Sequence, residues 1–292
     1  MNVFIIITVI LLSILLFYNY NSYLNNKYYN EGIEIIDKLN NVKKRDETFN
    51  SIKKYYINLE RSKDRLESIE KEFRDYEIGN YERIEACDGK NLSSIKKGKF
   101  KELEFENIKD TTITKSELAT TCSHLKAIKK AYDDGEEMAI IMEDDMNFTL
   151  MTHWKKSLGE ILENIPTDLE LLQLTHGKYG YLFLNILKPD FKKYYKEQKI
   201  KLRNRKETFC MGSYLITRLG MKKIVDKFFV KNKIILNNDK DIRIDIGILD
   251  LIKTYYLTEP LFLLDNFKSK TTVRNIDRHN YYESLEILKS YM

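Results

Sequence analysis

The sequence predicts an α/β fold built on a mostly parallel central sheet. One reason is that residues 138–142 form a continuous apolar run, which is typical of strands buried on both faces of a parallel sheet. Another is that a strand, a helix and a second strand are expected in succession over residues 54–86, the order of a βαβ unit. The composition agrees, because 43% of the 292 residues are apolar and 32% are charged, as in globular proteins with a sizeable core.

The βαβ unit opens the folded part of the chain. Residues 54–59 and 81–86 have the composition of strands, and the turn dipeptide Asp88-Gly89 follows the second. Between them, residues 62–76 are predicted to form a helix with Ser62 as its N-cap. The helix is expected because apolar side chains recur at helical spacing, at Leu66, Ile69 and Phe73.

A Lys-rich segment over residues 90–113 shows no regular pattern and is expected to be an irregular connection. Thr114 and Glu117 then have the spacing of a capping box, in which each side chain accepts a hydrogen bond from the other residue's backbone N–H. We therefore expect a helix from there to about residue 132, with His124 at the edge of its apolar face.

The second half of the chain continues the alternation of strands and helices. The pattern predicts strands over 138–142, 169–175 and 213–217, helices over 220–229 and 243–253, and a Pro-interrupted strand over 255–264. No internal repeat and no Gly/Ser-rich linker follows residue 50. Residues 51–292 are therefore predicted to be one domain.

The N-terminus is predicted to be a membrane anchor. Residues 3–17 are almost continuously apolar, and tyrosines follow directly, as aromatic side chains at a membrane interface do. A cleaved signal peptide is the alternative, but it would begin with basic residues and end at a small-residue cleavage site. We assign residues 1–20 to a single-pass anchor and 21–50 to a polar stem. The nearby charges do not indicate which side of the membrane the domain occupies.

The charge balance argues against nucleic acid as a partner. The net charge is only +5, from 49 Lys and Arg residues against 44 Asp and Glu residues, which is far from the balance of a dedicated nucleic-acid binder. A basic stretch over residues 185–208 is either a solvated face or a surface for an acidic acceptor or an anionic membrane. No disulfide framework is expected from the three widely spaced cysteines, Cys87, Cys122 and Cys210.

Three consecutive carboxylates, Glu143, Asp144 and Asp145, follow the apolar strand. In an extended strand, Glu143 and Asp145 would point to one side and Asp144 to the other. Carboxylates held together repel one another unless a cation joins them, and Mg²⁺ or Mn²⁺ suits such oxygens. Because open α/β sheets bind ligands at the carboxyl ends of their strands, the triplet predicts a metal–diphosphate site. A solvated turn or a two-metal phosphoesterase could contain the same residues.

Six segments, in order along the chain, resemble glycosyltransferase family 25. That family includes lipopolysaccharide-type sugar transferases and collagen hydroxylysine galactosyltransferases. Its corresponding elements are INLDRRPDR, AVDG, EIGCALSHL, LVLEDD, AYLIS with a later GA, and VD. In this chain they are YINLERSKDR at 56–65, IEACDG at 84–89, ELATTCSHL at 117–125, IIMEDD at 140–145, FCMGSYLITRL at 209–219 and ID at 244–245.

The resemblance implies a GT-A-like fold, which is a nucleotide-sugar-binding α/β sheet with a DXD-type motif. Glu143-Asp144-Asp145 would be that motif. Glu143 and Asp145 would bind Mn²⁺ or Mg²⁺, and Asp144 would belong to the binding site for the nucleoside-diphosphate sugar.

Donor binding would extend to the first strand and the helix after it. Asn58, Arg61 and Arg65 lie at the junction of these two elements, where the arginine fork and the helix N-terminus both favour a diphosphate. Asp88 and Gly89 would lie near the nucleoside.

The resemblance assigns catalysis to two further residues. His124 would contact hydroxyls of the donor or acceptor, and Asp245 would either deprotonate the acceptor hydroxyl or bind the acceptor. The expected function is metal-dependent transfer of a hexose, galactose or glucose, from a UDP-type donor to a glycan, lipid-linked or protein acceptor. Two other functions stay open: a non-catalytic binding module on the same fold, and a metal-dependent phosphoesterase.

Overall fold

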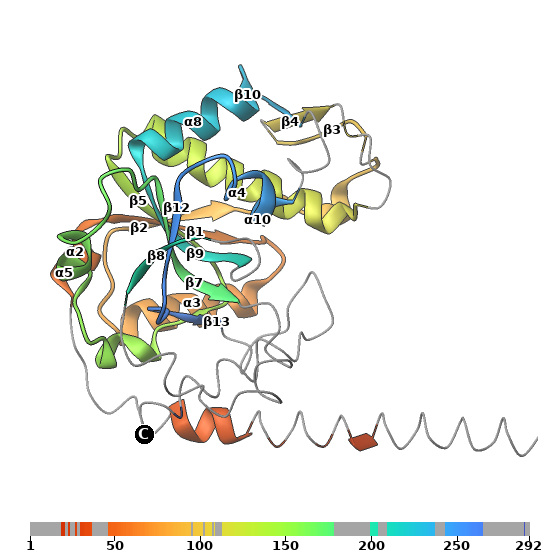
Figure 1. Ribbon diagram of the computed structural model, residues 1–292. Helices are drawn as coiled ribbons and strands as arrows, with labels where there is room; N and C mark the ends of the chain where they lie inside the picture. The colour runs from red at the N-terminus through yellow and green to blue at the C-terminus, as the bar shows by residue number, and fades with distance from the viewer. Residues whose placement is uncertain are drawn as a thin grey trace, which may run out of the picture.

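A computed structural model of the chain has a mixed sheet at its centre, with helices on both faces (Figure 1). The structure describes residues 19–20, 23, 27, 30–36, 46–94, 96–101, 103–106, 108, 113–177, 199–203, 209–236, 243–264 and 289.

Among the described residues, the central sheet has seven strands. In spatial order they are β2 (Tyr81–Glu85), β1 (Lys53–Asn58), β5 (Met138–Glu143), β9 (Phe209–Thr217), β7 (Leu171–Gly177), β12 (Thr254–Leu257) and β8 (Ile200–Leu202). Strand β9 is antiparallel to both of its neighbours and β8 is antiparallel to β12, whereas the other pairs are parallel. The predicted α/β fold is therefore confirmed, and its sheet is mostly parallel with two reversed strands.

The predicted βαβ unit is present at one side of this sheet. Strands β1 and β2 are parallel neighbours, and α3 (Lys63–Asp75) connects them. On the other side of β1 lies β5, with Ile57 opposite Glu143 in the register. The carboxyl ends of β1 and β5 therefore lie next to each other, which determines where the site forms.

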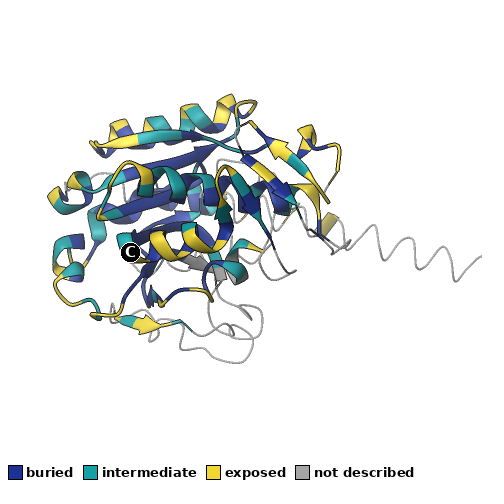
Figure 2. Ribbon diagram, turned by 90° about the horizontal axis from the view of Figure 1, so that it is seen from above, coloured by how far each residue is buried: buried dark blue, intermediate teal, exposed yellow. Residues whose placement is uncertain are grey.

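Helices cover both faces of the sheet and enclose two cores. One face carries α4 (Lys115–Asp133) and α8 (Arg218–Phe228), and the other carries α3, α2 (Glu47–Ser51) and α5 (Leu158–Leu162). Successive residues of β5 enter different cores, Ile141 the one under α4 and Met142 the one under α3. Figure 2 shows the buried strands between helices whose outer sides are exposed.

A second sheet overturns one prediction. Its strands are β10 (Phe229–Val230), β11 (Lys233–Ile235), β4 (Leu103–Glu106) and β3 (Gly98–Phe100), in that order. Strands β3 and β4 come from the segment expected to be an irregular connection. They form a hairpin because their alternate apolar side chains, including Phe105, are buried in the core under α4.

The remaining elements are short. They are the 3₁₀ helices η1 (Gly89–Asn91) and η2 (Thr149–His153), the helix α10 (Ile244–Gly247), and a two-stranded sheet of β6 (Met146–Asn147) and β13 (Leu263–Leu264). The helix predicted over 243–253 is thus confined to α10, which ends at Gly247, a poor helix former. The single Pro-interrupted strand predicted over 255–264 is instead two strands in different sheets, β12 and β13, with Pro260 between them.

Part of the predicted stem belongs to the core. Residues 30–36 are helical, and Ile35 and Ile36 are buried in the same core as Phe49 of α2. Phe49 is fully buried and its ring packs 5.4 Å from that of Phe262. The folded unit therefore includes residues before 51.

Two predicted features lie largely outside the described residues. Of the anchor at 1–20 only residues 19 and 20 are described, and of the basic stretch at 185–208 only 199–203. Within the part of the chain that the structure describes, no helix is long and apolar enough to cross a membrane. The anchor and the role of the basic stretch stay predictions.

Candidate active site

Polar side chains gather at the carboxyl ends of β1 and β5. Asn58 is the last residue of β1 and Glu143 the last of β5, and Asp144 and Asp145 form the turn that leads into β6. Since β1 and β5 are parallel neighbours, these side chains lie at one edge of the sheet. This is the edge at which open α/β sheets bind ligands.

The three carboxylates reach toward two different helices. Glu143 lies on the α4 face, where its Oε1 is 3.0 Å from Nε2 of His124, while Asp144 lies on the α3 face and accepts a hydrogen bond from Arg65. The prediction that Asp145 points to the side of Glu143 used strand alternation, but β5 ends at Glu143 and Asp145 lies in the turn that follows, so it stays a prediction. Oδ2 of Asp145 lies 3.5 Å from the guanidinium of Arg65, and the charge of Glu143 also acts on this carboxylate.

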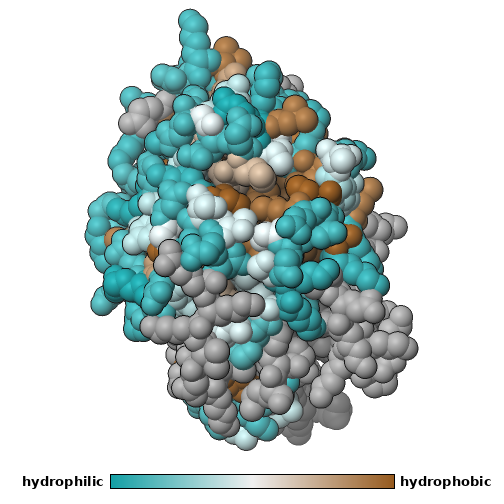
Figure 3. All heavy atoms as spheres, turned by 90° about the vertical axis from the view of Figure 1, so that its left-hand side faces the viewer, coloured by the Kyte–Doolittle hydropathy of each residue, from teal (hydrophilic) through white to brown (hydrophobic). Residues whose placement is uncertain are grey.

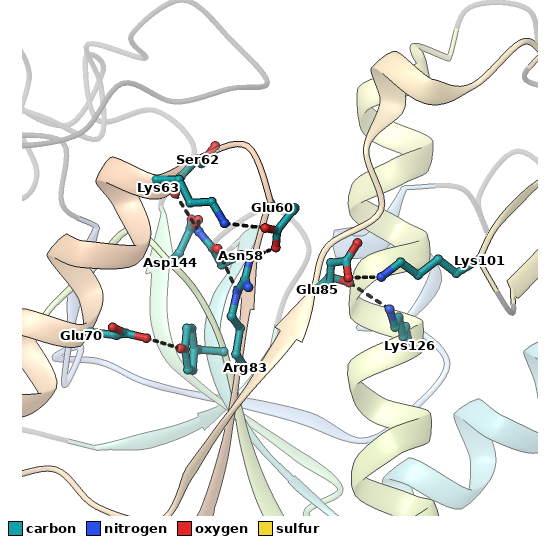
Figure 4. A network of polar contacts seen from close by, with 11 residues as sticks. Asn58, Glu60, Ser62, Lys63, Glu70, Arg83, Glu85, Lys101, Lys126 and Asp144 are labelled. Carbon is teal, nitrogen blue, oxygen red and sulfur yellow. Dashed lines mark hydrogen bonds and ion pairs between the residues drawn. The ribbon is translucent and has the colours of Figure 1, made fainter.

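Asp144 is held by two of the residues that were expected to bind the diphosphate. Asn58 donates from Nδ2 to Asp144 Oδ2 at 2.6 Å, and Nη2 of Arg65 donates to Oδ1. Asn58 also accepts a hydrogen bond of 3.1 Å from Nε of Arg83, as Figure 4 shows. Asn58 and Arg65 are buried, with 1% and 7% of their surfaces exposed. In this structure they fix the turn, and their predicted contact with a diphosphate stays a prediction.

Arg83 extends the network toward the surface. Its guanidinium lies 2.9 Å from Glu60, which also pairs with Lys63 (Figure 4). The two hydrogen-bonded cations lower the pKa of Glu60. Arg83 was not among the predicted site residues. It lies in β2 opposite Tyr56 of β1, two residues before Asn58, and a cation in the strand expected to pair with β1 is the signal that could have indicated it.

Arg61 and Asp88 form an ion pair near the same edge. Nε of Arg61 lies 2.7 Å from Asp88 Oδ2, and the other carboxylate oxygen accepts from the backbone N–H of Lys90 at the start of η1. Partial burial would raise the pKa of Asp88, but these two hydrogen bonds lower it. Gly89 has a packing role, because a Cβ there would lie 2.7 Å from the carbonyl oxygen of Lys115.

His124 was expected at the edge of the apolar face of its helix. It lies within the buried side of α4, with 1% of its surface exposed. The expectation was wrong because both sides of α4 are covered, by the central sheet and by α8. Each ring nitrogen has a protein partner: Nε2 contacts Glu143, and Nδ1 lies 3.1 Å from the hydroxyl of Tyr214. Tyr214 was missed as a site residue, because its strand also contains Ser213 and Thr217 and its hydroxyl does not stand out in the sequence.

The electrostatics of Glu143 and Asp145 differ. Burial would raise the pKa of Glu143, but the hydrogen bond from His124 and the charge of Arg65 lower it. Burial and the negative charge of Glu143 raise the pKa of Asp145 to about 6, and Arg65 opposes this only in part. The pair therefore carries negative charge that its neighbours do not fully neutralise.

These two carboxylates fit a divalent cation that is also held by its substrate. Oδ1 of Asp145 is buried and has no hydrogen-bond partner in the described part of the chain, while 31% of the Glu143 side chain is exposed. No group of three or more His, Cys, Asp or Glu side chains that could hold a metal occurs among the described residues. Mg²⁺-type ions are commonly bound by one or two carboxylates and substrate phosphates, so two ligands are a sufficient protein contribution.

Asp245 is placed only through its backbone. It lies in α10, which contacts both α4 and β9, the elements that carry His124 and Tyr214. The side chain of Asp245 is outside the described residues, so its predicted role as a base or acceptor ligand stays a prediction.

The comparison with protein families shows the class of the chain. A model of glycosyltransferase family 25, described as an LPS biosynthesis protein family, matches residues 51–242. The chain belongs to glycosyltransferase family 25. The match covers every predicted site residue of this glycosyltransferase except Asp245, which lies just beyond its end. A search of curated proteins finds no match to the chain.

Proposed function

We propose that this family 25 enzyme transfers a hexose, galactose or glucose, from a nucleoside-diphosphate sugar such as a UDP-sugar, using Mn²⁺ or Mg²⁺ and a GT-A-like fold. The observation that supports the proposal is the buried Oδ1 of Asp145, which has no hydrogen-bond partner among the described residues and lies beside Glu143 at the carboxyl edge of the sheet. The diphosphate of the donor is also an anion that needs a cation, so the two carboxylates and the donor would share one ion.

Each group at this edge then has a role. When bound, the ion would neutralise the diphosphate and stabilise the departing nucleoside diphosphate as a Lewis acid. Arg61, whose side chain is 40% exposed, is the arginine best able to turn from Asp88 to the diphosphate. Arg65 and Asn58 keep Asp144 fixed, so that the turn carrying Asp145 is preorganised.

The acceptor side of the proposal rests on fewer observations. We propose that Asp245 acts on the acceptor hydroxyl as a base, and that the acceptor is a glycan, a lipid-linked glycan or a protein. The apolar run at residues 3–17 would anchor the enzyme in a membrane as a single-pass protein.

The test is donor hydrolysis by the purified full chain, read by mass spectrometry with UDP-galactose and UDP-glucose. We expect release of UDP that depends on added Mn²⁺. Asp145→Asn removes one charged ligand and should lower the rate about 100-fold or more. Asp133→Asn is the matched control, because Asp133 forms a surface pair with Lys129 at the last residue of α4, and it should leave the rate unchanged.

Three outcomes would contradict the proposal. Turnover that is unaffected by chelation or by Asp145→Asn would remove the metal role. A protein that binds neither UDP nor Mn²⁺ in calorimetry would be a non-catalytic binding module. Release of inorganic phosphate from nucleotides without sugar transfer would identify a phosphoesterase.

A further inference from the structure

A tyrosine hydroxyl lies buried between the central sheet and α4. Tyr214 is fully buried in β9, opposite Ile141 in the register with β5. Its ring stacks on that of His124 with centroids 5.8 Å apart and an interplanar angle of 24°, and its hydroxyl is 3.1 Å from Nδ1 of that histidine. The hydroxyl of Tyr214 is therefore hydrogen-bonded to His124, the histidine that contacts Glu143.

The direction of these hydrogen bonds follows from the chemistry of the three groups. A carboxylate only accepts, so Nε2 of His124 donates to Oε1 of Glu143 across 3.0 Å. In a neutral imidazole, Nδ1 is then the acceptor and the hydroxyl of Tyr214 donates to it. Burial and the nearby charge of Glu143 raise the pKa of Tyr214 well above its ordinary value, so the hydroxyl keeps its proton.

We propose that Tyr214 is a positioning residue that acts through His124: its hydroxyl donates to Nδ1 and fixes the orientation of the ring, whose Nε2–H then holds Glu143 for a divalent cation. The proposal rests on the metal role proposed for Glu143 above. His124 contacts Oε1, so Oε2 keeps its lone pairs for the ion. Partners of this kind commonly orient metal ligands, and their removal weakens metal affinity about 10- to 100-fold.

A phenylalanine at 214 would fill the same space, which allows a sharp test. Tyr214→Phe removes only the hydroxyl. Tyr55→Phe is the matched control, because Tyr55 is also fully buried in the core under α4, and its hydroxyl bonds Asp134 near the end of α4, at 2.7 Å. Both variants lose one tyrosine hydrogen bond, but only the first touches His124.

The first readout is the tautomer of His124 in the metal-free protein. The full chain is labelled with ¹⁵N-histidine, and since it has only four histidines, His124→Gln assigns the signal. We expect the Nε2–H tautomer in all three proteins, because Glu143 still accepts from Nε2, and a shifted Nδ1 signal in Tyr214→Phe alone, because only there does Nδ1 lose its hydrogen-bond donor. A wild-type protein with the Nδ1–H tautomer would overturn the proposal even if Tyr214→Phe does not fold.

The second readout is Mn²⁺ affinity by calorimetry. Tyr214→Phe should bind Mn²⁺ about tenfold more weakly than the wild-type protein, and Tyr55→Phe equally well. In the His124→Gln background, Tyr214→Phe should cause no further loss, because no imidazole is left to orient. An unchanged Nδ1 signal and an unchanged affinity in Tyr214→Phe would overturn the proposal. A wild-type protein that binds no Mn²⁺ would overturn the proposed metal site, whereas the Nδ1 signal would still decide whether the Tyr214 hydroxyl bonds His124.

Discussion

Arg65 is the single side chain on which the geometry of the carboxylate turn depends most. Its guanidinium contacts both Asp144 and Asp145, and only 7% of its surface is exposed. Buried carboxylates are strongly destabilising without a partner, because their desolvation is then not compensated. The residue predicted from the sequence to hold a diphosphate therefore holds the protein's own acids.

Arg65→Met tests this role through stability. The change keeps the aliphatic bulk but leaves two buried acids without their cation, so we expect a loss of about 3–5 kcal/mol in the free energy of unfolding. The control is Arg61→Met, because the Arg61–Asp88 pair is more exposed, and its loss should be about 1 kcal/mol or less. Urea denaturation measures both, and similar losses in the two variants would show that Arg65 has no special structural role.

At the level of helices and strands, the chain contains two predicted N-caps that the structure treats differently. Thr114 and Glu117 form the full capping box at the start of α4, with hydrogen bonds of 3.1 and 2.9 Å. Ser62 precedes α3, but its side chain makes no capping hydrogen bond. Sequence spacing identified both helix starts, but only the structure shows at which of them the capping hydrogen bonds form.

These caps predict unequal effects of the same kind of substitution. Thr114→Ala should lower the free energy of unfolding by about 1 kcal/mol, because the backbone N–H of Glu117 loses its partner. Ser62→Ala should change it by much less, since no capping hydrogen bond is lost. Thermal and urea unfolding of the two variants compare them directly, and a larger loss for Ser62→Ala would contradict the assignment of the caps.

Over the whole molecule, stability depends on burial of both faces of the sheet. Figure 3 shows one side of the protein, where hydrophilic side chains surround a smaller hydrophobic group. Large apolar side chains exposed in the folded part are scattered over separate elements: Tyr81, Leu202, Leu219, Val230 and Leu251. The buried residues include a lysine. Lys54 is 0% exposed, and its ammonium group donates to the carbonyl oxygens of Asn50, Ile52 and Gly79.

Lys54 makes the stability of the molecule depend on pH. Burial lowers its pKa from 10.5 to about 7, although the charge of Asp46 opposes the shift. Between these two values the unfolded chain binds a proton that the folded protein does not, so stability should rise with pH in this window. The rise attributable to one group is at most about 1.4 kcal/mol per pH unit.

Lys54→Met removes that proton uptake from the unfolded chain. We measure denaturation at pH 7, 8 and 9. The free energy of unfolding of the wild-type protein minus that of the variant should increase with pH. The control Lys53→Met, at a side chain that is 25% exposed, should keep the pH dependence of the wild-type protein. A difference that stays constant over this range would show that Lys54 keeps its proton in the folded state.

The order of the main elements was predictable because it depends on neighbouring residues. The apolar run became β5, the helical spacing of Ile69 and Phe73 became the buried side of α3, and the capping box became the start of α4. The hairpin of β3 and β4 was not predictable in the same way. Its outer partner is β11, a strand far along the chain, and long-range pairing leaves little trace in local pattern.

The candidate site was also predictable only in part. Sequence pattern was enough to place three carboxylates at the end of a buried strand and to indicate the family, because both follow from residue types in order. Which side chains meet those carboxylates required the folded chain. Arg65 reaches Asp144 across 79 residues of sequence, and Tyr214 reaches His124 across 90. Such contacts form only when parallel strands and the helices on both faces bring distant segments to one edge, and local periodicity carries no information about that arrangement.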